Sequence, residues 1–153
     1  MKRLIFPAIA AIAIVLTLSG CKKKKDGGFV FYPSYTSDFY GTVWSGTMNG
    51  SETDGDVTTN YTQTLRIEFY KGDTFTIDLN NEVTRVKTVP IQFTGTYWFE
   101  KEDRKIHFYV TSISPEVYDY PVDFTGMYSY FTHTLSFGNT CDMFGPIDLT
   151  LQN

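Results

Sequence analysis

Apolar and polar residues alternate along most of the chain with a period of two. Every second residue is apolar in residues 65–70, a turn containing Gly72 follows, and the alternation resumes in residues 74–79. Because successive side chains of a β-strand point to opposite faces, this alternation predicts two half-buried strands. The glycine in the short turn between them indicates a β-hairpin.

The same alternation predicts further strands toward the C-terminus. A second turn is expected at residues 80–82, followed by a strand over residues 83–89. Pro90 ends that strand, because proline cannot donate a hydrogen bond to a strand ladder. The remaining strands are expected at residues 93–99, 106–110 and 147–151, with a charged turn at residues 100–105.

Three segments of the chain resemble one another: FYGTVWSG at residues 39–46, FTGTYWFE at 93–100 and FTGMYSYF at 124–131. Each is interpreted as the first arm of a hairpin, with its glycine at a bulge, a bend or a close backbone approach. The first hairpin is expected to return through a polar loop at residues 49–59. The third is expected to return through a turn at Thr132 and His133, with a single long strand containing a bulge as the alternative.

No long stretch after residue 21 carries apolar residues at helical spacing, so an all-β domain is predicted. About eight or nine strands joined by short turns favour an antiparallel up-and-down β-barrel. A two-sheet β-sandwich is the alternative, because periodicity alone does not distinguish it from a barrel.

The N-terminus has the pattern of a targeting segment. Lys2 and Arg3 precede an apolar run, which ends in Leu18-Ser19-Gly20-Cys21. This tetrapeptide resembles the lipobox of bacterial lipoproteins, in which the signal peptide is cleaved before the cysteine and the cysteine carries the lipid, palmitate included. A transmembrane anchor is the alternative, but the run is shorter than the ~20 residues that a spanning helix needs.

The lipobox resemblance implies a division of the chain and a location. Residues 1–20 are expected to be the signal peptide, residues 21–38 the lipidated cysteine and a tether, and residues 39–153 the β-barrel domain. The lipid on Cys21 implies attachment to a membrane of the bacterial cell envelope. Lys22 does not match the aspartate-type signal that retains some lipoproteins in the inner membrane, so the outer membrane is favoured.

The distribution of charge excludes nucleic-acid binding. The chain has 13 basic and 17 acidic residues, but six of the basic ones are Lys2, Arg3 and the lysines at 22–25. Without those six and Asp26, 7 basic and 16 acidic residues remain, a net charge of −9. Binding to a phosphate backbone depends on Lys and Arg, which acidic residues outnumber more than two to one in this part of the chain. The lysines at 22–25 are instead suited to anionic lipid headgroups, at ~1 kcal/mol each.

The lipobox, the short tether and two Gly-Thr-x-Trp sequences resemble the small lipocalin-like lipoproteins of Bacteroidetes-type bacteria. The two sequences are Gly41 to Trp44 and Gly95 to Trp98, and the resemblance covers residues 39–153. It implies a lipocalin-like (calycin) barrel of roughly eight strands, open at one end as a cup that binds small apolar molecules.

Two functions follow from such a barrel. If the barrel is a cup, the side chains of one strand phase line a cavity for a small apolar ligand. The candidate ligand-binding residues are Trp44, Tyr97, Trp98, Phe99, Phe108 and Tyr128. If side chains fill the barrel, as eight strands allow, the protein is an envelope interaction or structural protein with no small-molecule ligand.

Candidate chemistry is sparse. His107 and His133 are the histidines, and no nucleophile elbow, zinc-binding or phosphate-binding motif occurs, so neither an enzyme nor a cofactor is predicted. Glu52, Asp54 and Asp56 offer oxygen ligands for Ca²⁺ but lack the EF-hand order, so a solvated loop without metal is expected. Cys141 is expected to be an idle thiol, because no basic residue adjoins it.

The aromatic residues between 29 and 35 are unusual for a tether, which is normally polar. We expect them to close one end of the barrel. An additional edge strand, or contact with a partner or a membrane, are the alternatives.

Overall fold

The computed structural model describes residues 21–23, 29–84, 86–116, 123–138 and 145–152. The expected signal peptide at 1–20 and Cys141 lie outside these residues. No helix in the described part of the chain is long and apolar enough to cross a membrane.

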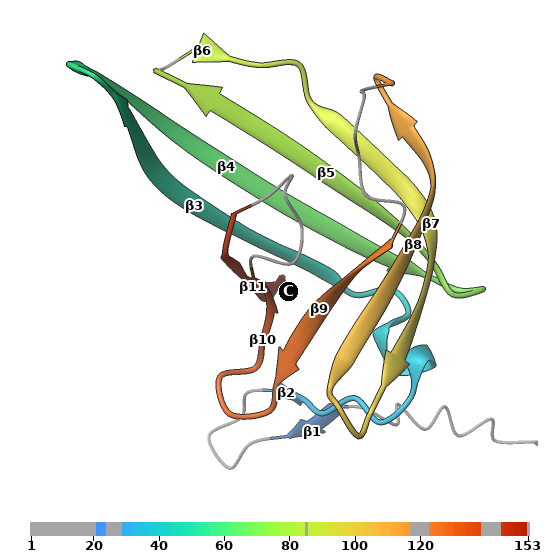
Figure 1. The fold of residues 1–153 in the computed structure, drawn as a ribbon. Coiled ribbons are helices and arrows are strands. Elements are labelled where there is room, and N and C mark those ends of the chain that lie inside the picture. Colours follow the sequence, from blue (N-terminus) through green and yellow to red (C-terminus); the bar gives the residue numbers. More distant parts are fainter. Residues whose placement is uncertain (1–20, 24–28, 85, 117–122, 139–144, 153) are drawn as a thin grey trace, which may run out of the picture.

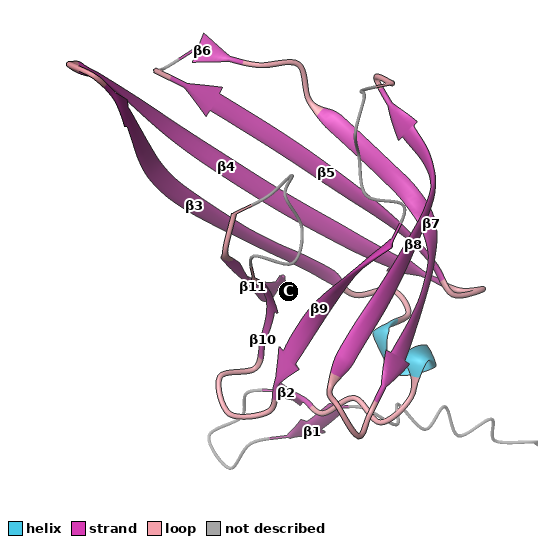
Figure 2. Ribbon diagram, viewed as in Figure 1, coloured by secondary structure: helices cyan, strands magenta, loops and turns pink. Residues whose placement is uncertain are grey.

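Eight strands form one closed antiparallel barrel, with neighbours in sequence paired side by side (Figures 1 and 2). They are β3 (Val43–Asp54), β4 (Val57–Tyr70), β5 (Thr74–Val83), β7 (Ile91–Glu100), β8 (Lys105–Ser114), β9 (Asp123–Ser129), β10 (Thr134–Phe137) and β11 (Ile147–Gln152). The last strand returns to the first, since Leu151 pairs with Trp44. This closure confirms the predicted all-β, up-and-down barrel and excludes the β-sandwich.

The central hairpin has the predicted register. Phe69 pairs with Phe75 and Leu65 with Leu79, on either side of the turn that contains Gly72. The second turn was predicted wrongly: residues 80–82 continue β5, and the chain reverses near Thr84, which has a positive φ of 48°. The two-residue strand β6 (Val86–Lys87) then pairs with the end of β5.

The polar segment at residues 49–59 is also a strand pair and not the expected loop. β3 and β4 stay paired to Asp54 and Val57, beyond the rest of the barrel (Figure 1). Cross-strand threonines support this extension, because the hydroxyls of Thr53 and Thr58 lie 3.2 Å apart. Alternation did not reveal it, since both faces of the extension meet solvent and neither needs apolar residues.

The three glycines of the repeated segment have different roles. A Cβ on Gly95 would lie 1.9 Å from the carbonyl oxygen of Tyr109, where the β7–β8 register shifts at a bulge. A Cβ on Gly126 would lie 2.9 Å from Leu135 inside the barrel. Gly41 precedes β3 in a turn and has a φ of 74°. Each segment does lead into the first strand of a hairpin, as predicted, in the pairs β3–β4, β7–β8 and β9–β10. The three glycines, however, are not equivalent in structure.

Aromatic side chains from every part of the sheet fill the barrel. Phe108 stacks on Phe124 at 4.9 Å between ring centroids and meets Phe75 edge-on at 5.0 Å. Away from these rings, the amide of Gln63 binds Asn81 and accepts a hydrogen bond from the backbone of Gly145. Gln63 is the one polar residue buried in the described part of the chain.

The segment before the barrel covers one of its ends, which we call the closed end (Figure 1). It comprises β1 (Cys21–Lys23), β2 (Phe29–Phe31) and the 3₁₀-helix η1 (Thr36–Phe39). Phe31 is buried against Phe39, Trp44 and Tyr128, at 5.1 to 5.8 Å between ring centroids. Part of the expected tether therefore packs into the barrel. The prediction that residues 29–35 close one end is confirmed for Val30 and Phe31, whereas Tyr32 and Tyr35 are exposed.

Candidate functional site

Five of the six candidate ligand-binding residues lie inside the barrel. Trp44, Tyr97, Phe99, Phe108 and Tyr128 are all buried. Their rings contact one another and the remaining core, as when Phe69 approaches Tyr97 at 4.6 Å and Phe108 at 6.0 Å. The predicted phase is therefore right, but these side chains fill the space that a ligand would occupy.

The polar atoms of these interior residues are paired within the protein. The indole nitrogen of Trp44 donates to the Thr42 hydroxyl at 3.0 Å. The hydroxyl of Tyr128 donates to the Phe31 carbonyl at 2.6 Å. Among the described residues, no buried side-chain nitrogen or oxygen lacks a hydrogen-bond partner. The described interior residues thus leave no buried polar group free to bind a ligand.

Trp98 lies on the outside of the barrel, apart from the other five residues. It follows Tyr97, which points inward, so strand alternation turns its side chain to solvent with 52% of its surface exposed. Its ring stacks on His107 at 4.4 Å, with 2° between the ring planes. The two residues pair directly across β7 and β8. The sequence carried this signal, because Trp98 and His107 both fall in the outward phase.

A small cleft adjoins this stacked pair. It has a volume of about 180 Å³ and runs beside Trp98 and His107 to Asp123 and Thr125 on β9. His107 is held in place by Glu100, whose Oε2 lies 2.9 Å from its Nε2.

Two more apolar side chains on β8 and β9, Tyr109 and Met127, are exposed nearby. Met127 pairs with Lys105, and Tyr109 pairs with Asp123. Both residues therefore lie next to the His107–Thr125 pair on the outer face of β8 and β9. We call Trp98, His107, Tyr109, Asp123 and Met127 the Trp98 surface. It is a largely aromatic area with Glu100 and Asp123 at its border and Lys105 opposite Met127.

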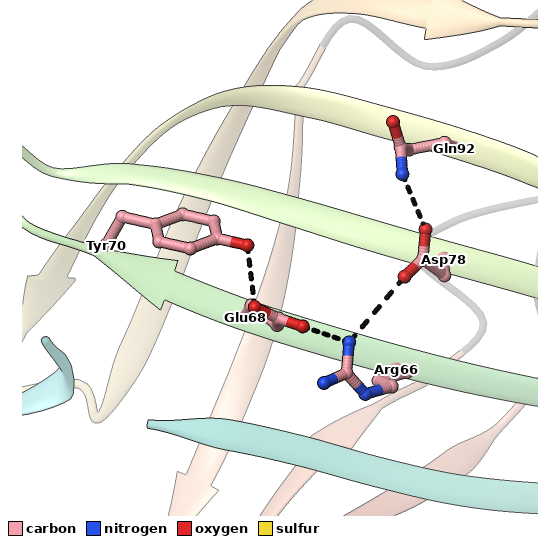
Figure 3. Close-up of polar contacts among 5 residues, drawn as sticks. All are labelled: Arg66, Glu68, Tyr70, Asp78 and Gln92. Atoms are coloured by element: carbon pink, nitrogen blue, oxygen red, sulfur yellow. Dashed lines mark hydrogen bonds and ion pairs between the residues drawn. The ribbon is translucent and has the colours of Figure 1, made fainter. Parts of the chain in front are cut away.

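The outer face of β4, β5 and β7 carries a polar network (Figure 3). Arg66 contacts Glu68 on its own strand and lies 3.8 Å from a carboxylate oxygen of Asp78 on β5. Tyr70 donates to Glu68 at 2.6 Å, and Gln92 donates to Asp78 at 2.8 Å. The Tyr70 hydrogen bond, followed by the one from Arg66, lowers the pKa of Glu68. These groups satisfy one another and form a structural ladder across three strands.

A larger cleft of about 370 Å³ lies beside the far ends of β4 and β5. Its lining residues are mostly uncharged and polar: Thr62, Thr64, Asn80, Asn81, Glu82, Thr88 and Pro90. Thr88 fixes the segment before β7 here by donating to the Asn81 carbonyl at 3.0 Å. The cleft has no aromatic residue and one charged group, so it offers little chemistry to a specific ligand.

The acidic residues considered for Ca²⁺ lie on the β3–β4 extension. Glu52, Asp54 and Asp56 are all exposed. Throughout the described part of the chain, no three His, Cys, Asp or Glu side chains gather closely enough to hold a metal ion. His133 lies at the closed end, where its Nδ1 is 3.2 Å from the Tyr128 hydroxyl.

Comparisons of the chain with protein-family models, with curated proteins and with solved structures find no match. The candidate site therefore depends on the geometry alone, which gives a filled interior and an exposed aromatic surface on β7, β8 and β9.

Proposed function

We propose that this protein is a lipid-anchored protein of the bacterial envelope whose barrel is a rigid binding module. In this proposal it contacts a partner through the Trp98 surface and carries no ligand in its interior. The observation that supports it is the filled barrel: the aromatic residues that would line a cup are packed against one another. A guest molecule would have to displace them from a close-packed core.

The anchoring half of the proposal is supported by the lipobox at residues 18–21. Lipidation of Cys21 would attach the barrel to the membrane, and the outer membrane is the favoured location. The resemblance to lipocalin-like lipoproteins is consistent with this arrangement, except that binding would take place on the outer surface of the barrel and not in its interior.

The chemistry of the Trp98 surface suggests a basic partner. Trp98 has Glu100 beside it on the outward phase of β7, and Asp123 lies across the adjoining cleft. A lysine or arginine side chain from the partner can lie over the indole ring while these carboxylates attract its charge. The net charge of −9 over residues 27–153 would attract such a partner over a longer range.

Native mass spectrometry of the protein, purified from cells under non-denaturing conditions, tests whether the barrel interior holds a ligand. We expect the mass of the lipidated chain alone, and no binding when long-chain fatty acids are added. A stoichiometric apolar molecule that survives purification would contradict the filled-barrel proposal.

A photo-crosslinking residue at position 98 tests the outer surface in living cells. Thr150, which is exposed on β11, provides the control position. We expect a discrete crosslinked partner from position 98 and not from position 150, and we expect Asp123→Asn to weaken it. Equal crosslinking from both positions would argue against the Trp98 surface.

A further inference from the structure

We infer that the closed end of the barrel lies directly on the lipid bilayer, with Phe131 and Tyr35 inserted among the lipid headgroups. This inference rests on the proposed lipid anchor at Cys21 and specifies the lipid surface as a second partner. It also fixes the orientation of the protein, with the β3–β4 extension pointing away from the membrane.

The attachment point of the lipid is part of the closed end. β1 pairs with β2, so that Cys21 lies opposite Phe31. Phe31 is itself buried among Phe39, Trp44 and Tyr128 in the barrel. The backbone of Cys21, where the lipid would be attached, is therefore one strand away from Phe31 and the core.

Exposed aromatic side chains gather at this same end. Phe131, at the tip of the β9–β10 turn, is 95% exposed, and Tyr35 before η1 is 67% exposed. The two segments are tied together, because Tyr130 donates to the Pro33 carbonyl at 2.6 Å and its ring stacks on Tyr32 at 6.3 Å. Tyrosine is enriched where a protein meets the membrane interface, and phenylalanine is among the residues that interfacial segments bury in the bilayer.

The turn does not need an apolar residue at position 131. The Ser129 hydroxyl accepts a hydrogen bond from the Thr132 backbone at 3.1 Å, and the Ser129 carbonyl accepts one from His133 at 2.8 Å. The hydroxyls of Thr132 and Thr134 lie 2.7 Å apart. None of these interactions involves the Phe131 side chain, so the turn itself gives no reason for an apolar residue there, and contact with lipid would give one.

The charges of the molecule favour the same orientation. Lys22 and Lys23 belong to β1 at the closed end, and Arg104 in the β7–β8 turn lies close enough to lower the pKa of Tyr130, although burial raises that pKa overall. The β7–β8 turn is balanced, with Glu100, Glu102 and Asp103 against Lys101, Arg104 and Lys105, so Lys22 and Lys23 outweigh Asp38 and decide the sign of this end.

The opposite end has the opposite sign. The β3–β4 extension carries Glu52, Asp54 and Asp56 without a basic residue and lies far from the closed end (Figure 1). An anionic bilayer attracts the first end and repels the second.

Depth-dependent fluorescence in vesicles tests the orientation. The full-length lipidated protein is reconstituted in vesicles of phosphatidylethanolamine and phosphatidylglycerol, with Cys141→Ser to remove the other thiol. An environment-sensitive dye is attached through Phe131→Cys or, as the control, through Val57→Cys at the exposed tip of the β3–β4 extension. We expect a blue-shifted dye at 131 that spin-labelled lipids quench, and a water-exposed, unquenched dye at 57.

Each alternative gives a different result. Equal, unquenched emission from both positions, with the protein still floating with the vesicles, would overturn the orientation and leave the lipid anchor intact. A blue shift at 131 without quenching by lipid would indicate a protein partner or a second copy at the closed end, and would also overturn it. Protein that fails to float with the vesicles would contradict the proposed lipid anchor itself, and the orientation with it.

Discussion

At Gly95 the backbone of β7 approaches that of β8 more closely than any side chain permits. A Cβ there would lie 1.9 Å from the Tyr109 carbonyl oxygen, which belongs to the partner strand and cannot rotate away. The sequence marked this glycine as a bulge or a close approach, and the position is both. The reason that a strand needs glycine can thus be predicted from its place in an alternating pattern.

We expect Gly95→Ala to destabilise the barrel by about 2–3 kcal/mol, because both strands must shift to admit the methyl group. Urea unfolding monitored by circular dichroism measures the difference. Gly138→Ala is the matched control, since a Cβ at Gly138 meets no atom within 4 Å. Equal stability of the two variants would show that the backbone at the bulge can shift without lowering the free energy of unfolding.

Ionisation of Tyr97 makes the stability of the folded state depend on pH in the alkaline range. Burial is the main cause that raises its pKa, with smaller contributions from Tyr40 and Asp73. The unfolded chain ionises this phenol near its ordinary pKa of about 10, whereas the folded chain keeps it neutral. The contribution of Tyr97 to stability is therefore fully present below about pH 10 and is lost progressively as the pH rises above that value.

We expect Tyr97→Phe to lose stability at neutral pH and to recover it relative to the natural protein above about pH 10. The neutral loss is about 1 kcal/mol or less, because the Tyr97 hydroxyl makes a long hydrogen bond of 3.3 Å to the Thr36 carbonyl. Urea unfolding at a series of pH values measures the crossover. Tyr35→Phe, which changes an exposed ring, is the control and is expected to show no crossover in stability with pH. Parallel pH profiles of the two variants would contradict the prediction.

At the scale of elements, β2 and η1 pack into one end of the barrel although alternation does not reveal them. Phe31 and Phe39 are both buried between the ends of several strands. Thr36 of η1 accepts a hydrogen bond from the backbone of Phe99 on β7 at 3.0 Å. A three-residue strand and one turn of 3₁₀-helix are too short to show a period, so only their aromatic content indicated a role.

We expect Phe31→Ala to cost about 3–5 kcal/mol, the usual loss when a buried phenylalanine leaves a cavity. Thermal unfolding of the variant measures this loss. Tyr35→Ala, four residues along and exposed, should change stability by less than about 0.5 kcal/mol. A small effect of Phe31→Ala would mean that residues 29–31 cover the barrel without stabilising it.

At the scale of the whole molecule, stability depends on closing the sheet. β11 is the closing strand, because it pairs with β10 on one side and with β3 on the other. It also contributes Leu149 and Ile147 to the core. A barrel without this strand has two open edges, which are templates for association with other chains.

We expect a chain that ends at Pro146 to lose its cooperative fold and to aggregate, because both edges and part of the core are exposed. Size-exclusion chromatography and thermal unfolding test this outcome. The control is a chain that lacks only its last two residues, which leaves Leu149 and most of β11 in place. A monomeric, cooperatively folded product from the shorter chain would show that closure is dispensable.

The sequence alone determined the strands and their inward faces, because alternation is a local property that each strand displays. It placed Phe99 and Phe108 in one interior and predicted the hairpin around Gly72, and it contained the lipobox on which the anchoring proposal depends. It misplaced the turn after β5 and the β3–β4 extension, where polar strands show no contrast between their faces.

Only the tertiary structure decided what the barrel encloses and what it presents outside. Closure, the packing of Phe31 into one end and the filling of the interior depend on contacts between residues far apart in the chain. Whether aromatic side chains line a cavity or fill it is a matter of volume, which periodicity does not measure. The position of Trp98 outside the barrel, beside His107, likewise became a candidate site only when three strands were brought together.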